Sequence, residues 1–477
     1  MPQGLKILFA ASEAGPFIKS GGLGDVAASL PKALLKSGND VRVILPLYLD
    51  IDAELRAKLK YTGSVYVPLS WRKQYCGVYE TEYDGVIYYF IDNEYYFKRN
   101  GIYGHFDDAE RFSFFSKAIL ESMAVTGFYP DILHTNDWQT ALVSVFLDVF
   151  YRYGSYQNIR TVFTIHNIEF QGKYGLEVGG DIIGVDKNAL RLVEYDKCVN
   201  FMKGAIEAAH AVTTVSETYA KEILDPFYSY GLEGILKYRQ FKISGIVNGI
   251  DTESYDPKTD CALLKNYDAD SVALRGENKK NLLDMLHLPY AENRPLIGMV
   301  TRLTAQKGLD LLSKVAEDIL GKDISLVVLG KGDWKYETML KDLERRYPNK
   351  IKAVIGFSLD VASKIYGSAD FLLMPSKFEP CGLSQMIAMR YGAIPIVREA
   401  GGLKDTVKAY NHVTGEGNGF TFKSYDAYDM LDAVTRASDI YYKKDEMNKV
   451  IKNAMACDFS WAESARKYEK LYREILR

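Results

Sequence analysis

The chain has 477 residues, more than one hydrophobic core usually organises, so we expect two or three domains. Its hydrophobic content of 47% and charged content of 25% are typical of a soluble globular protein. A net charge of −3 argues against a nucleic-acid-binding surface and against a membrane-surface patch. The five cysteines are scattered, and none is spaced for a zinc site. We therefore expect a cytoplasmic protein without a membrane segment.

The first predicted strand, residues 6–11, is followed by a glycine-rich loop over residues 12–26 and then by a predicted helix. Glycines let the backbone approach a ligand closely, and the start of the helix offers a positive dipole end. Lys19 adds a cation at the same place, and Glu13 and Asp25 bracket the glycines. A plain turn between strand and helix is the alternative, but a lysine with two acids favours a ligand-binding loop.

Polar residues follow two later strands of the first half. The strand at 131–135 leads into Asn136 and Asp137, and the strand at 161–165 leads into His166 and Asn167. In a parallel sheet, ligands bind at the carboxyl ends of strands. A single histidine after a strand is more often structural, but two such polar ends in succession favour a site.

Three further segments of the first half have less specific patterns. Residues 61–92 alternate apolar and polar side chains and are predicted to form antiparallel or edge strands. The aromatic and basic loop 94–106 is suited either to stacking on a sugar chain or to packing on the core, and the sequence leaves both open. Residues 246–251 are predicted to form a strand that turns at Asn-Gly, and we place the domain junction near residues 244–251.

From residue 296 onward, strands alternate regularly with helices. This alternation predicts a doubly wound parallel sheet. Strands are expected at 296–301, 325–329, 351–355, 371–374 and 394–397, and helices at 309–320, 334–347, 360–366 and 384–391. Arg302 and Lys307 flank the start of the first of these helices, which is a two-cation arrangement suited to a diphosphate. A basic turn on the solvated surface is the alternative.

Glu379 stands between the strand at 371–374 and the helix at 384–391. Pro380 and Gly382 break the chain there, so the carboxylate lies at the carboxyl end of a strand, beside the unpaired N–H groups of a helix start. An acid next to an anion-binding helix start suits a ligand with both sugar hydroxyls and phosphates. The alternative is that Glu379 is only a loop charge that caps the helix.

Four motifs in this order resemble those of bacterial glycogen synthase and plant starch synthase. They are KSGGLGDV at 19–26, HN at 166–167, RLTAQKGLD at 302–310 and PSKFEPCGL at 375–383. The resemblance runs nearly the whole length of the chain. It implies an α/β fold of the GT-B architecture, with two Rossmann-like doubly wound domains facing across a deep cleft.

The implied domains are residues 1–245 on the acceptor side, 246–458 for the nucleotide sugar, and a terminal helix over 459–477 that crosses back to the first domain. The implied reaction of glycogen biosynthesis is the retaining transfer of glucose from ADP-glucose to the non-reducing end of an α-1,4-glucan. The family needs no metal and no cofactor, since ADP-glucose is a substrate. The implied partners are therefore ADP-glucose and the glucan acceptor.

The resemblance also implies roles for individual residues. It makes Glu379, His166, Asp137, Arg302 and Lys307 the catalytic group, in which the two cations hold the diphosphate and stabilise it as it leaves. The residues implied to bind substrate are Lys19, Gly21, Gly22, Asp25, Glu13, Asn167, Phe357, Cys381, Gly382, Leu383, Gly401 and Gly402. Phe357 matches an aromatic position near the adenine.

Two positions depart from the family pattern. Ser20 replaces the usual threonine, and Ile387 stands where related transferases carry a second glutamate, so the preference for ADP-glucose over UDP-glucose is open. A UDP-sugar-dependent GT-B glycosyltransferase acting on another acceptor is therefore the main alternative. A non-catalytic glucan-binding protein has no use for leaving-group cations. A dinucleotide-dependent oxidoreductase ranks lowest, because a complete GxGxxG followed by a ribose-binding acid is missing.

Overall fold

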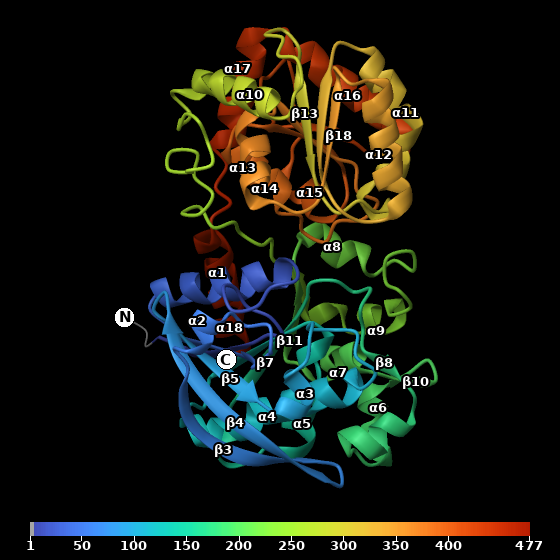
Figure 1. Cartoon of the computed structure of the whole chain (residues 1–477). Helices are drawn as coiled ribbons and strands as arrows, with labels where there is room; N and C mark the ends of the chain where they lie inside the picture. The colour runs from blue at the N-terminus through green and yellow to red at the C-terminus, as the bar shows by residue number, and fades with distance from the viewer. Residues whose placement is uncertain (1–3) are drawn as a thin grey trace. The chain divides into compact units, whose positions relative to one another are not determined.

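The computed structural model describes residues 4–477, which form two compact units (Figure 1). The first unit ends at Gly249 and also contains Trp461–Arg477, and the second is Ile250–Ser460. The boundaries expected from the sequence were 245/246 and 458/459, and the structure has them at 249/250 and 460/461. The terminal segment is thus part of the first unit.

The first unit is built on a nine-stranded sheet in the order β12-β11-β7-β6-β1-β2-β5-β4-β3. From β12 to β5 all neighbours are parallel, while β4 and β3 are antiparallel additions at the edge. The strands are β1 (Lys6–Ala10), β2 (Asp40–Pro46), β3 (Lys60–Leu69), β4 (Arg72–Tyr83), β5 (Val86–Asp92), β6 (Ile132–Asn136), β7 (Arg160–Ile165), β11 (Ala211–Thr214) and β12 (Ile243–Gly245). The predicted antiparallel edge is confirmed for β3 and β4, whereas β5 pairs in parallel with β2.

Helices and a small second sheet complete the first unit. The helices are α1 (Gly22–Lys36), α2 (Ala53–Arg56), α3 (Glu94–Phe97), α4 (Asp108–Thr126), α5 (Leu142–Phe150), α6 (Lys187–Val193), α7 (Phe201–Ala208), α8 (Glu217–Glu222), α9 (Glu233–Tyr238) and α18 (Trp461–Ile475). The small sheet contains β8 (Lys173–Tyr174), β10 (Cys198–Asn200) and β9 (Glu194–Tyr195) in that order. Helix α18 packs against α1 and buries Tyr468 and Tyr472 in the core.

The prediction of a strand at 246–251 is wrong, because the structure has no strand there. The last strand of the first sheet, β12, ends at Gly245, and Ile246 N makes the final hydrogen bond to β11, at Thr214 O (2.8 Å). After that the backbone finds other partners, because Val247 O accepts from Ser464 Oγ (2.7 Å) and Ile250 N donates to Phe459 O (2.8 Å). The apolar pattern marks an extended chain, but its hydrogen bonds go to residues 459–464 instead of a sheet.

The second unit is a six-stranded, all-parallel sheet in the order β15-β14-β13-β16-β17-β18. Its strands are β13 (Leu296–Val300), β14 (Ser325–Gly330), β15 (Ile351–Ile355), β16 (Phe371–Met374), β17 (Ile394–Arg398) and β18 (Phe420–Phe422). Its helices are α10 (Arg275–Met285), α11 (Leu309–Gly321), α12 (Trp334–Arg346), α13 (Leu359–Ser368), α14 (Ser384–Arg390), α15 (Gly401–Thr406), α16 (Ala427–Tyr441) and α17 (Lys444–Met455). Helices α11 and α12 cover one face of the sheet, and α13 and α14 the other (Figure 1). The doubly wound α/β fold is confirmed.

Strand order reverses once in each sheet, between β1 and β6 in the first unit and between β13 and β16 in the second. At such a point the loops after the two neighbouring strands lead to helices on opposite faces, and the gap between them is where doubly wound sheets bind ligands. The loops concerned are 11–21 after β1, 137–141 after β6, 301–308 after β13 and 375–383 after β16. Most of the predicted site residues lie in these four loops.

Candidate active site

The second unit brings Lys307 and Glu379 together. Lys307 lies in a single 3-10 turn between β13 and α11, and its Nζ is 2.6 Å from Glu379 Oε2. Ser376 Oγ donates to the same oxygen at 2.9 Å. Glu379 is only 6% exposed, so its carboxylate depends on these two partners for the solvation that burial removes. The loop residues 376–382 are called the Glu379 loop below, and residues 302–307 the cation turn.

Arg302, the second predicted cation, lies at the start of the cation turn. Its Nη2 donates to Gln306 Oε1 (3.3 Å), and Gln306 in turn contacts the Glu379 loop through its backbone oxygen, which accepts from Lys377 N (2.8 Å). The cation turn and the Glu379 loop are therefore joined by backbone as well as by the ion pair. Arg302, Lys307 and Glu379 therefore lie in the two loops at the switch point of this sheet.

Three predicted glycines allow close packing around the Glu379 loop. Gly382 has φ +72° and Gly401 has φ +44°, a region that side chains disfavour. A Cβ on Gly401 would lie 2.0 Å from Glu379 O, and one on Gly402 would lie 2.1 Å from Cys381 O. Gly402 N donates to Glu379 O (3.1 Å), so a backbone hydrogen bond holds the Glu379 loop against the start of α15.

The other predicted residues of the second unit divide into exposed and buried ones. Phe357 follows β15 and is 85% exposed, so its ring is free to stack on a flat ligand. Cys381 is buried, and its carbonyl accepts from Gln385 Nε2 at 3.2 Å. Leu383 is partly buried and caps the start of α14. Only Phe357 among these three presents a large surface to solvent.

In the first unit, Glu13 organises the glycine loop after β1. The carboxylate is 2% exposed, and Oε2 accepts from both the backbone N and the Oγ of Ser20 (2.6 Å each). Its other oxygen, Oε1, accepts from Gly24 N (3.2 Å). The hydroxyl at position 20 is used in folding the loop, and threonine would supply the same group. Glu13 thus holds the backbone around Gly21, the residue that caps α1.

Lys19 and Asp25 form an exposed ion pair of 2.6 Å at the start of α1, with 43% and 39% of their side-chain surfaces accessible. Pairs this exposed contribute little to stability, about 0–1 kcal/mol. A ligand phosphate could therefore take Lys19 as a partner at small cost to the fold. Gly22, the first residue of α1, has nothing within 4 Å of the place where a Cβ would stand.

Asp137, His166 and Asn167 form a second cluster in the first unit. Asp137 has φ +55°, which a residue with a side chain rarely adopts, and such strain often marks functional positions. Its Oδ1 accepts from His166 N (2.8 Å) and Asn167 N (3.4 Å). Burial raises the pKa of Asp137 to about 7, and the two backbone N–H groups only partly oppose that rise.

The ring of His166 has a defined tautomer. Asn136 Nδ2 donates to Ala10 O (3.0 Å), which turns its Oδ1 towards His166 Nε2 at 2.9 Å. Because Oδ1 can only accept, Nε2 carries the hydrogen and Nδ1 keeps its lone pair. Burial lowers the pKa of His166 to about 3, so the ring is neutral near pH 7. A neutral imidazole with a free lone pair can accept a hydrogen bond from a sugar hydroxyl.

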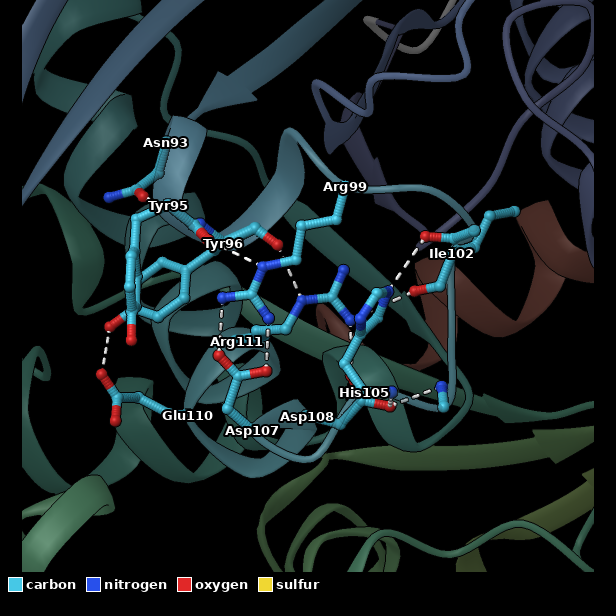
Figure 2. Close-up of polar contacts among 12 residues, drawn as sticks. Asn93, Tyr95, Tyr96, Arg99, Ile102, His105, Asp107, Asp108, Glu110 and Arg111 are labelled. Carbon is cyan, nitrogen blue, oxygen red and sulfur yellow. Dashed lines mark hydrogen bonds and ion pairs between the residues drawn. The ribbon is translucent and has the colours of Figure 1, made fainter.

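The sequence placed Asn136 at a polar strand end, and Ser376 and Tyr103 in candidate loops, but it did not predict which residues they contact. Tyr103 Oη lies 2.8 Å from Ser12 Oγ, next to Glu13. The loop that carries Tyr103 is held by two arginines, as Figure 2 shows: Arg99 binds both oxygens of Asp107 (2.6 and 2.8 Å). The partner of such a hydroxyl or amide depends on how distant segments fold together, which the local sequence does not show.

Arg111 is the second arginine of that loop. Its Nε donates to Tyr96 O (2.8 Å), and its Nη1 contacts Ile102 O and Asp108 (Figure 2). The aromatic loop is thus folded and anchored, with Tyr96 buried. Tyr95 and Phe106 are nevertheless 63% and 93% exposed, so packing on the core accounts for part of this loop, and stacking of these two rings on a sugar stays a prediction.

His134 belongs to the core and not to a site. It is fully buried between Tyr472 Oη (2.7 Å from Nδ1) and Thr164 Oγ1 (2.6 Å from Nε2). Across residues 4–477 we find no group of three His, Cys, Asp or Glu side chains placed to hold a metal ion. Within the same range, every helix is too short or too polar to span a bilayer.

The chain matches two protein-family models. Residues 6–238 match the starch synthase catalytic domain, and residues 287–456 match glycosyl transferases group 1. A glycogen synthase from Clostridium acetobutylicum is 51% identical over 99% of this chain and 100% of its own length. One from Anoxybacillus flavithermus is 47% identical over 99% of this chain and 98% of its own.

Two solved structures superpose on this chain over nearly its whole length. The catalytic domain of starch synthase IV from Arabidopsis thaliana, bound to ADP and acarbose, superposes with a TM-score of 0.91 at 35% identity, covering 99% of this chain and 100% of that one. Sucrose-phosphate synthase from Thermosynechococcus elongatus superposes with a TM-score of 0.62 at 17% identity over 98% of each chain, which shows a shared fold alone.

Proposed function

This chain belongs to the glycogen synthase family, and we propose that it transfers glucose from ADP-glucose to the non-reducing end of an α-1,4-glucan, with retention and without a metal or cofactor. The observation that carries the proposal is the pairing of Lys307 with Glu379 at a switch point that also holds Arg302. The starch synthase that shares the fold was solved with ADP and acarbose, which supports a nucleotide and a saccharide as ligands.

The second unit supplies the charges that the reaction needs. The bond between the anomeric carbon and the phosphate oxygen breaks, so negative charge builds up on the diphosphate while the sugar becomes positive. Arg302 and Lys307 would stabilise the departing ADP more strongly than the bound ADP-glucose, which lowers the barrier. Glu379 would lie beside the glucose and stabilise its positive charge. The glucose C1 ends on the 4-hydroxyl oxygen of the glucan, and the hydroxyl proton leaves with ADP.

Glu379 acts here through its charge and not as a nucleophile. Retaining glycosidases use a carboxylate that forms a covalent glycosyl intermediate, and Glu379 would be the chemical candidate. Its oxygen Oε2, however, already accepts from Lys307 and Ser376, which reduces its nucleophilicity. We propose that departure of ADP and attack of the acceptor occur on one face of the sugar.

The residues of the first unit keep the roles that the family resemblance implies. Lys19 and the backbone at Gly21 and Gly22 would contact the phosphates of the donor. His166 would accept a hydrogen bond from the transferred glucose at Nδ1. Asp137 would lie near the reacting centre, where its raised pKa places its charge change close to neutral pH.

One incubation tests the proposal. The protein is mixed with glycogen and radiolabelled ADP-glucose or UDP-glucose, with EDTA present, and label in the polymer is counted. We expect incorporation from ADP-glucose that EDTA leaves unchanged and that exceeds incorporation from UDP-glucose. Preferential transfer from UDP-glucose would favour the UDP-sugar-dependent alternative. Loss of activity in EDTA, restored by a divalent cation, would contradict the metal-free part.

A further inference from the structure

We propose that Tyr425 is a positioning residue that fixes the cation turn relative to the Glu379 loop. This inference rests on the proposed function, which gives the two segments their charged roles. Tyr425 lies in the loop between β18 and α16, and none of the four family motifs includes this loop. Its hydroxyl contacts the cation turn and the start of α11, and its ring contacts the Glu379 loop.

The hydroxyl of Tyr425 holds the cation turn. Tyr425 Oη is 2.5 Å from Asp310 Oδ1 and 3.0 Å from Ala305 O, so its single proton is shared between a carboxylate and a backbone oxygen. Ala305 begins the 3-10 turn that carries Lys307, and Asp310 lies in the first turn of the following helix α11. The phenol therefore ties both sides of Lys307 to one fixed point.

The ring of Tyr425 supports the Glu379 loop. Lys377 Nζ lies 5.8 Å from the ring centroid, and Arg398 Cζ lies 5.6 Å from it, both within the range of cation–π attraction. Arg398 Nη1 also donates to Lys377 O (2.6 Å) and Ser376 O (3.3 Å). The backbone just before Glu379 is thus held by an arginine that packs on the same tyrosine.

The contacts of Tyr425 explain why it would act through other residues. Tyr425 contacts Asp310 and Ala305 through its hydroxyl and Lys377 and Arg398 through its ring, so it acts on Lys307 and Glu379 through their neighbours. Removing the hydroxyl leaves the Lys307–Glu379 pair intact but frees the turn that carries Lys307. Misplacement by a fraction of an ångström weakens electrostatic stabilisation of the transition state more than it weakens binding of the donor.

The test compares Tyr425→Phe with Tyr428→Phe, a tyrosine three positions on that is 69% exposed. For Tyr425→Phe we expect kcat to fall about tenfold, the loss of one hydrogen bond to a charged group, while KM for ADP-glucose changes by less than about twofold. ADP binding, measured by calorimetry, should weaken several-fold, because ADP carries the full charge that the cations stabilise. Tyr428→Phe should match the wild type in all three quantities.

Two results would overturn the inference. The first is wild-type kcat and ADP affinity in Tyr425→Phe. The second is a loss of kcat that disappears on cooling and follows a lower thermal midpoint, as expected of a purely structural residue. Absence of glucose transfer in the wild type would count against the proposed function, and ADP calorimetry would still test the role of Tyr425.

Discussion

Lys307 and Glu379 form an ion pair of 2.6 Å in which only 16% and 8% of the side-chain surfaces reach solvent. Salt screens so sheltered a pair weakly, and removal of one partner leaves the other charge buried. A diphosphate that binds Lys307 must therefore compete with the carboxylate. The carboxylate holds the ammonium group of Lys307 in position, and we expect a bound donor to bring a phosphate oxygen to the same ammonium group.

Replacement of Glu379 by glutamine should separate binding from turnover. We expect kcat to fall about a hundredfold or more, since a charge aimed at the transition state is lost. ADP should bind more tightly than to the wild type, because the competing carboxylate is gone. Calorimetry and steady-state rates measure the two effects.

Ser376→Ala is the matched control for Glu379→Gln, since it removes a hydrogen bond to Glu379 Oε2 and keeps the charge. It should lower kcat far less and leave ADP affinity near the wild-type value. Mass spectrometry of the native protein during turnover should find no glucose attached to Glu379. A trapped adduct there, or weaker ADP binding by Glu379→Gln, would contradict this role.

Gly22→Ala should stabilise the folded protein and weaken its use of ADP-glucose. Gly22 begins α1 with open space where a Cβ would stand, and replacing glycine by alanine at a compatible position stabilises a protein by about 0.4–1 kcal/mol, because the unfolded chain loses freedom. If the backbone there approaches the donor, the added methyl group raises KM for ADP-glucose. We expect a higher thermal midpoint together with a higher KM.

Gly276 offers the control, because it lies in α10 and also has nothing within 4 Å of its absent Cβ. Gly276→Ala should raise the thermal midpoint and leave KM unchanged. An unchanged KM in Gly22→Ala as well would remove Gly22 from the substrate-binding residues.

Asp137 should make stability depend on pH. Its pKa rises from 3.8 to about 7 on folding, so the folded state holds a proton that the unfolded chain has lost over this interval. This contribution is full below the unfolded pKa and is lost as the pH rises towards 7. Asp137→Asn removes the titration. The thermal midpoint of the variant minus that of the wild type should therefore increase between about pH 5 and pH 7.5. A difference that stays constant over this range would show that folding does not raise the pKa of Asp137.

The parallel strands and the candidate loops were predictable from the sequence. Strand β16 has the predicted bounds, because a strand buried on both faces is a continuous apolar run. Glu379 and Lys307 were predicted as site residues because ligands of parallel sheets bind at the carboxyl ends of the strands, and both residues follow such ends. Their contact with each other was not predictable, since it depends on how two loops 72 positions apart fold.

The support around these residues gave no signal in the sequence. Tyr425 contacts Ala305 across 120 positions, and a tyrosine in a polar loop looks like any other. His134 lies within β6 and His166 directly follows β7, yet one is a core residue and the other borders Asp137. The distinction comes from α18, since its Tyr472, 338 positions further along the chain, hydrogen-bonds with His134.

Tyr472→Phe should destabilise the first unit without affecting turnover. Burial lowers the pKa of His134 to about 3, so its neutral ring has one donor and one acceptor nitrogen, satisfied by Thr164 and Tyr472. Loss of the tyrosine hydroxyl leaves a buried nitrogen without a partner, which costs about 1–3 kcal/mol. Urea unfolding should show this loss, whereas Tyr153→Phe, at a tyrosine that is 64% exposed, should not. Equal stability of the two variants would mean that the hydrogen bond between Tyr472 and His134 does not contribute to stability.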